Sequence, residues 1–189
     1  IQKMASIGPR SVREYLFLRQ VQLTISLYFQ HGSTSPKKVN CLHATLRDLI
    51  EAEIRVKNLP WIVKEEQRMD AVNASGKKRC DLVVFDANKP IYVFPVKFIM
   101  TSYKKNKNNY WENLSGETCQ LHWANPTLKI VPINIILSKT PAIKNGKIKS
   151  FEEIKYDKTL NISEVLVREG ICSNIVNIII AVDQIDKIG

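Results

Sequence analysis

The residues that decide the fold are Arg79-Cys80-Asp81-Leu82-Val83-Val84-Phe85-Asp86 and, shortly after them, Phe94-Pro95-Val96-Lys97. Both segments are apolar, and Ala87-Asn88-Lys89-Pro90 between them is typical of a tight turn. We expect a β-hairpin in which Asp81 opens the first strand and Lys97 closes the second. These two side chains would then meet at one edge of the sheet. A carboxylate beside an ammonium can form a metal-assisted site that cleaves phosphodiesters, because the carboxylate binds a divalent cation and the ammonium offsets charge or orients water.

The spacing of these residues resembles a known nuclease motif. Asp81, thirteen intervening residues and then Pro95-Val96-Lys97 are similar to the signature of the PD-(D/E)XK nuclease superfamily, which includes most type II restriction endonucleases. The resemblance covers residues 79–140. It departs from the family pattern at Cys80, a loosely defined position, and at Pro95, where the family carries a metal-binding acid.

Two interpretations of Pro95 remain open: the site is inactive, or the second acid lies elsewhere. In one subgroup of restriction enzymes the glutamate is displaced onto the helix that follows the lysine. Glu112, fourteen intervening residues after Lys97, is close to that spacing, with an insertion of about one residue, and on this basis we expect Glu112 to be the second acid. Helical geometry alone favours Glu117, which lies nearer the apolar stripe of the same predicted helix.

An upstream helix offers a further acid. Residues 38–58 are predicted to form a helix whose apolar stripe comprises Leu42, Leu46, Leu49, Ile50 and Ile54. Glu53 falls near the middle of that stripe, where a carboxylate is costly unless it is paired or binds a cation. Many members of the PD-(D/E)XK superfamily carry a glutamate on an upstream helix that reaches the metal site. The resemblance therefore implies that Glu53 assists in binding the metal. The alternatives are a salt bridge to a core arginine and a position on the solvent-facing edge of the helix.

The net charge of +10 is unevenly distributed along the chain. Residues 101–149 contain eight lysines and two glutamates, so six of the ten net charges lie there. Clustered lysines favour a polyanionic partner because phosphate contacts release counterions. A solvated lysine-rich surface is the alternative, but beside a nuclease motif we expect double-stranded DNA.

Two segments are candidates for DNA contact. In the restriction enzymes with the displaced glutamate, the connection between the strand that carries the lysine and the helix that carries the glutamate reads bases. The corresponding candidates here are Ser102, Tyr103, Lys104, Lys105, Asn106, Lys107 and Asn108. Lysine and asparagine can read guanine and adenine edges, although contact with phosphates alone is an equal alternative. The second segment, residues 141–158, contains a predicted turn at Asn145-Gly146 and is either a solvated loop or a DNA-facing arm.

The remaining pattern predicts an α/β fold. We expect a mixed central β-sheet of about five strands flanked by helices on both faces. The predicted helices are residues 11–28, 38–58, 108–123 and 164–169, and further strands are predicted at 61–64, 129–137 and 174–182. The helix at 11–28 is densely apolar, which favours burial on more than one side. We expect one nuclease domain over residues 1–189, with a helical N-terminal part (1–60) and a catalytic core (61–189).

Composition also bears on location. No apolar run is long enough to cross a membrane, and four widely spaced cysteines with no CxxC pair indicate reduced, mostly buried thiols in a cytoplasmic protein.

The resemblance to the PD-(D/E)XK superfamily implies a Mg²⁺-dependent type II restriction endonuclease that acts on double-stranded DNA as a homodimer. Asp81 and Glu112 would bind the metal, Glu53 would assist them, and Lys97 would position the attacking water. A structure-specific nuclease, such as a Holliday junction resolvase or repair enzyme, shares this site and is one alternative. A DNA-binding module with a decayed nuclease site is the other, and Pro95 favours it.

Overall fold

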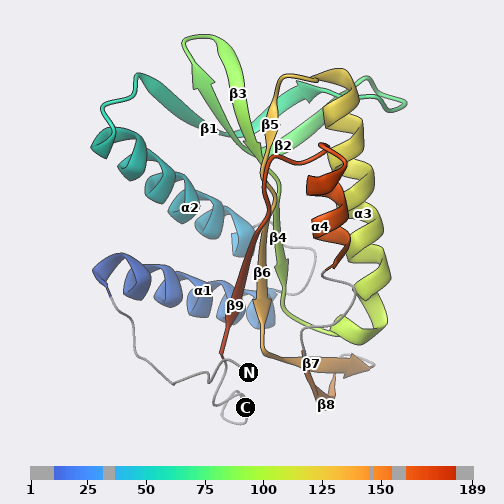
Figure 1. The fold of residues 1–189 in the computed structure, drawn as a ribbon. Helices are drawn as coiled ribbons and strands as arrows, with labels where there is room; N and C mark the ends of the chain where they lie inside the picture. Colours follow the sequence, from blue (N-terminus) through green and yellow to red (C-terminus); the bar gives the residue numbers. More distant parts are fainter. Residues whose placement is uncertain (1–10, 32–36, 145–146, 155–160, 182–189) are drawn as a thin grey trace. The chain divides into compact units, whose positions relative to one another are not determined.

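The chain divides into two compact units, Ile1–Pro60 and Trp61–Gly189. The computed structural model describes residues 11–31, 37–144, 147–154 and 161–181. The division falls where the helical part of the sequence was expected to end. The architecture is α/β, as predicted, and contains parallel and antiparallel strands (Figure 1).

The first unit contains two helices, α1 (Val12–His31) and α2 (Lys37–Val56). The predicted stripe of α2 is confirmed at Leu42, Leu46 and Ile54, which are buried. Helix α1 is present as predicted, but the expected burial on more than one side is wrong. Its buried residues, Phe17, Val21 and Thr24, lie along one side of the helix. Four large apolar side chains of α1 are exposed, namely Val12, Tyr15, Leu16 and Leu23.

The second unit begins with an antiparallel meander. Strands β1 (Trp61–Asp70), β2 (Lys77–Asp86) and β3 (Lys89–Phe94) pair in sequence order, and the short β5 (Lys129–Ile130) joins β3 in parallel. The predicted hairpin is therefore present, with a turn at Ala87-Asn88.

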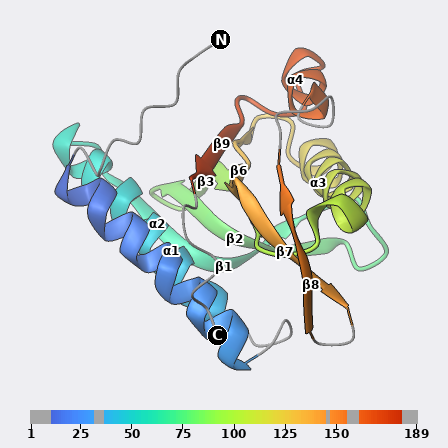
Figure 2. The same ribbon diagram turned by 90° about the horizontal axis from the view of Figure 1, so that it is seen from below.

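Two helices cover one face of this sheet. They are α3 (Tyr103–Ala124) and α4 (Asn161–Arg168), which lie together on the same side of the strands (Figures 1 and 2). Leu121 of α3 and Leu166 of α4 share a buried apolar cluster with Val83 of β2, Val93 of β3 and Ile130 of β5. Burial of these side chains supplies the main driving force that holds the helices on the sheet.

The strands continue beyond two prolines as a second, parallel sheet. Strands β4 (Val96–Ile99), β6 (Ile133–Leu137) and β9 (Val176–Ile180) pair in the order β4-β6-β9. Pro95 separates β3 from β4, and Pro132 separates β5 from β6. Proline has no N–H to donate, so the ladder is interrupted at both positions. Ile133 N still donates to Pro95 O at 2.8 Å, and the two sheets therefore run on from one another.

A separate two-stranded ribbon follows. Strands β7 (Lys139–Lys144) and β8 (Lys147–Glu153) pair antiparallel, which confirms a hairpin at this place. The predicted turn residues 145–146 and the end of the predicted loop, residues 155–158, lie outside the described residues. The base of the ribbon is tied to the start of α3, because Ser102 N donates to Pro141 O at 2.9 Å and Ile143 N donates to the Ser102 hydroxyl at 3.2 Å.

Several predicted boundaries were wrong. The polar connection expected after residue 64 is mostly strand: β1 continues to Asp70, with Val63 and Met69 buried and exposed residues on either side of each. Helix α3 begins five residues earlier than predicted, at Tyr103, whose side chain is buried beside Trp111 and Leu114. Ser163 lies inside α4 rather than capping it, whereas Gly170 has the expected positive φ of 71° after its end.

Candidate active site

Asp81 is fixed beside the strand that carries Lys97. The β2–β3 register pairs Leu82 with Phe94, so its continuation places Asp81 opposite Pro95, which has no N–H. The next residue supplies one instead: Val96 N donates to Asp81 Oδ2 at 2.7 Å. Asp81 therefore lies against the backbone of the residue before Lys97, although Asp81 lies in the middle of β2 rather than at its start, and Lys97 lies in β4 rather than at the end of β3.

The β1–β2 ladder has a gap at Asp81. Glu65 pairs with Leu82 and Gln67 with Cys80, so Glu66 is the residue directly opposite Asp81. Glu66 has a left-handed backbone conformation, with φ 56°, which is uncommon for a residue with a side chain. Carboxylate oxygens of Glu66 and Asp81 lie within 4.8 Å of each other. Irregularities of this kind re-aim side chains within a sheet, and here two acids meet at the irregularity.

A third acid, Glu117, lies between two lysines. Its Oε2 is 2.8 Å from Lys97 Nζ, and its Oε1 is 3.6 Å from Lys78 Nζ. The Glu117 side chain is only 9% exposed, so its charge is compensated by these partners rather than by water. The Arg79 guanidinium forms an ion pair with Glu66. Three carboxylates and three cations thus surround this part of β2.

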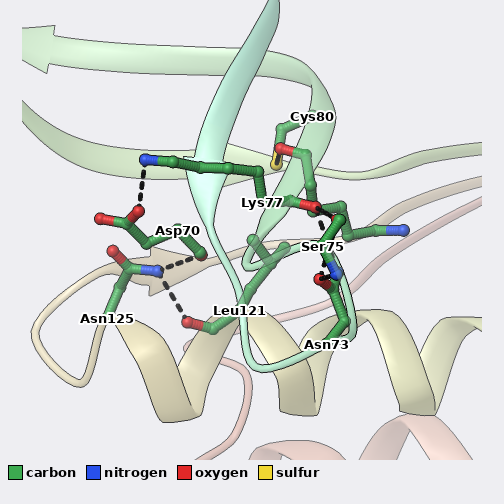
Figure 3. A network of polar contacts seen from close by, with 8 residues as sticks. Asp70, Asn73, Ser75, Lys77, Cys80, Leu121 and Asn125 are labelled. Atoms are coloured by element: carbon green, nitrogen blue, oxygen red, sulfur yellow. Dashed lines mark hydrogen bonds and ion pairs between the residues drawn. The ribbon is translucent and has the colours of Figure 1, made fainter.

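Helix α3 is held in register with the β1–β2 hairpin, which sets the position of Glu117. Val72 N donates to Gln120 O at 2.9 Å. Asn125 Nδ2 donates to Asp70 O at 2.7 Å and to Leu121 O at 3.0 Å, and an ion pair links Lys77 to Asp70 (Figure 3). These contacts join the C-terminal part of α3, which begins about one helical turn after Glu117, to the loop between β1 and β2.

The structure does not bring Glu112 to this cluster. Glu112 is exposed on α3, and five residues at 100° each turn it about 140° away from Glu117. Only one of the two acids can therefore face Lys97, and that acid is Glu117. The expectation from spacing placed the inward acid five residues too early.

Glu53 also differs from its expected position. Its side chain is 57% exposed rather than set in an apolar stripe, and Arg13 Nη1 lies 2.5 Å from its Oε1. This ion pair links α1 and α2 within the first unit, and because Arg13 is itself 54% exposed, the position corresponds to the solvent-facing alternative rather than to a core arginine.

The predicted DNA-contacting segment is divided by the start of α3. Lys104, Lys105 and Asn108 are exposed on its first turns. Tyr103 is 3% exposed and belongs to the core, so its expected contact with DNA was wrong. The Ser102 hydroxyl is used by β7, and Asn106 and Lys107 are half-buried.

Cys80 lies among the charged residues of the site. Burial, followed by the negative charges of Glu117 and Asp81, raises the pKa of this thiol to about 12, because each disfavours a thiolate. Burial likewise raises the pKa of Cys172 to about 11. All four cysteines are free; Cys80 and Cys172 are buried, Cys119 is half-buried and Cys41 is exposed.

The thiols are therefore expected to react in a defined order. In the folded protein near neutral pH, an alkylating reagent should modify Cys41 first and leave Cys80 and Cys172 unmodified, since only the thiolate reacts and both are protonated and buried. Mass spectrometry of peptides from a time course measures this order, with urea-unfolded protein as the control in which all four react. Early modification of Cys80 would contradict the burial and the raised pKa of its thiol.

Sequence reasoning missed Glu66, Lys78 and Arg79 as members of the site. Glu66 lies opposite Asp81 only through the observed register of β1 with β2, in which Asp70 pairs with Lys77, and no motif in the sequence pointed to it. No protein-family model matches this sequence, and no curated protein matches it. None of the described helices is long and apolar enough to cross a membrane.

Proposed function

We propose that this protein is a metal-dependent endonuclease of the PD-(D/E)XK kind that cleaves double-stranded DNA at a short sequence, in the manner of a type II restriction enzyme. One observation carries the proposal: the Asp81 carboxylate is held by Val96 N–H next to Lys97, with the Glu66 carboxylate within 4.8 Å. Homodimer formation belongs to the same proposal, since one site per chain must act on two strands.

The residues present are compatible with Mg²⁺. Two oxygens bound to one Mg²⁺ lie up to about 4.2 Å apart, so small rotations bring the Glu66 and Asp81 oxygens within range. These two residues would hold the ion, which would lower the pKa of a bound water and offset negative charge on the phosphate. Without a bound cation, Arg79 neutralises the charge of Glu66. The Arg79 side chain is exposed, so it can move away from Glu66 when a cation binds.

Lys97 supplies the cationic group of the proposed reaction. Its ammonium donates to Glu117, which restricts the rotamers of a long side chain and sets where its charge lies. From this position Lys97 orients the attacking water and stabilises the charge that develops on the phosphate oxygens. Glu117 is accordingly a positioning residue, shared between Lys97 and Lys78, and it replaces Glu112 in this proposal.

Incubation with supercoiled plasmid tests the function directly. With Mg²⁺ we expect discrete linear fragments, and with EDTA no cleavage, because removal of the cation removes the activated water. The fragments should be the same for repeated preparations and should change with the plasmid sequence. Cutting restricted to synthetic four-way junctions would instead indicate a structure-specific nuclease.

A DNA-binding module with a decayed site is the second candidate. Pro95 favours it, since this buried residue provides no carboxylate and serves as the junction between two sheets. That function predicts DNA binding with no cleavage under any divalent cation, which the same assay detects.

A further inference from the structure

The β7–β8 ribbon has an unusual charge distribution along its length. At its base Lys139 pairs across the strands with Glu153, which are opposite charges. At its distal end Lys144 is directly opposite Lys147, and residues 142–150 contain no acid. Like charges at directly opposed positions destabilise a hairpin. An anion close to these lysines would relieve that repulsion.

The distal lysines are available for such a partner. Lys144 and the four consecutive residues 147–150 are exposed. No ion pair joins Lys144, Lys147 or Lys149 to another described residue. The ribbon has six residues in β7, which corresponds to about 20 Å of extended chain, so its end can reach well beyond its base.

The base of the ribbon, by contrast, is fixed to α3. Ser102 bonds to Pro141 and Ile143, and Glu152 Oε2 accepts from Lys104 N at 2.9 Å. This last contact caps the first turn of α3, where Ser102 makes no side-chain cap. These contacts hold the base of the ribbon against the first turn of α3, which carries the exposed Lys104 and Lys105. The lysines of that turn and the distal lysines of the ribbon can therefore contact the phosphates of one nucleic-acid molecule.

We propose that the distal end of the β7–β8 ribbon enters the major groove of duplex DNA, with Lys144, Lys147 and Lys149 on the flanking phosphates. The choice of duplex DNA as partner rests on the proposed function. The B-form major groove, about 12 Å wide, admits a two-stranded β-ribbon, whereas the A-form groove of duplex RNA is too narrow. Ile148, 40% exposed between two of the lysines, is the apolar side chain that would face the base edges.

The test compares two double variants of equal charge. K147Q/K149Q alters the ribbon, and K64Q/K89Q removes two exposed lysines elsewhere in the same unit. Binding to a short mixed-sequence DNA duplex is measured without metal over a series of salt concentrations, and then repeated with an RNA duplex of the same sequence. The ribbon variant should flatten the salt dependence on DNA by up to about two units of slope. The control variant should keep the wild-type slope, and the RNA duplex should show a smaller change.

Each other outcome is decisive. An unchanged slope for K147Q/K149Q would overturn the ribbon contact and leave the nuclease proposal standing if plasmid is still cut. Equal losses on DNA and RNA would overturn the groove placement. A reduced slope with no cleavage would support the ribbon and contradict the nuclease. No binding of wild-type protein to DNA would overturn both.

Discussion

Replacement of Asp81 by asparagine is expected to lower Mg²⁺-dependent plasmid cleavage by at least about a hundredfold. The amide oxygen can still accept from Val96 N, so the local structure is kept while the negative charge is lost. DNA binding should stay within about tenfold, or 1.4 kcal/mol, because the positioning contacts lie elsewhere. The measurements are the initial rate of plasmid linearisation and the binding isotherm of the same preparation.

A second aspartate on β2 provides the matched control. Asp86 is exposed at the hairpin turn, opposite Lys89, and Asp86→Asn should leave the cleavage rate unchanged. Cleavage by Asp81→Asn at the wild-type rate would remove Asp81 from the site and the proposed function with it.

The choice between Glu117 and Glu112 predicts the other large effect. Glu117→Gln should reduce cleavage by about a hundredfold, because Lys97 loses the carboxylate that holds its ammonium. Glutamine keeps the volume and one hydrogen-bond acceptor, so the protein should remain folded by circular dichroism. Glu112→Gln, on the exposed side of the same helix, should retain most of the activity.

A positioning role for Glu117 has a further signature. If Glu117 acts through Lys97, the dependence of the cleavage rate on Mg²⁺ concentration should keep its midpoint in Glu117→Gln while the maximal rate falls. A large shift of that midpoint would instead make Glu117 a metal ligand. An inactive Glu112→Gln together with a fully active Glu117→Gln would return the second acid to the position predicted from spacing.

The sequence was sufficient for the central hairpin because its signals agree. Apolar strands on either side of a turn predict the hairpin, although the turn is Ala87-Asn88 rather than residues 87–90, and an irregularity between Val84 and Phe85 shifts the register. It was insufficient for β1, where Glu65–Asp70 is polar and suggested a connection. That segment pairs with β2 alone, and several of its polar side chains, including Arg68 and Asp70, are exposed, so polarity does not oppose a strand.

The candidate site was only partly predictable. Asp81 and Lys97 followed from one motif and one hairpin. Glu117 lay on the apolar face of its helix, and that geometric signal was outweighed by a spacing carried over from other enzymes. Glu66, Lys78 and Arg79 depend on the pairing of β1 with β2, which no local propensity specifies. Long-range register was therefore the missing information.

The left-handed backbone of Glu66 has an evolutionary consequence. A side chain in this conformation costs about 1 kcal/mol relative to glycine, which adopts it freely. Most domains retain only a small margin of stability, and selection for folding alone would favour glycine here. Glycine would also remove the carboxylate that faces Asp81. A glutamate at position 66 is thus consistent with selection for the chemistry of the pair at the expense of the stability of the strand.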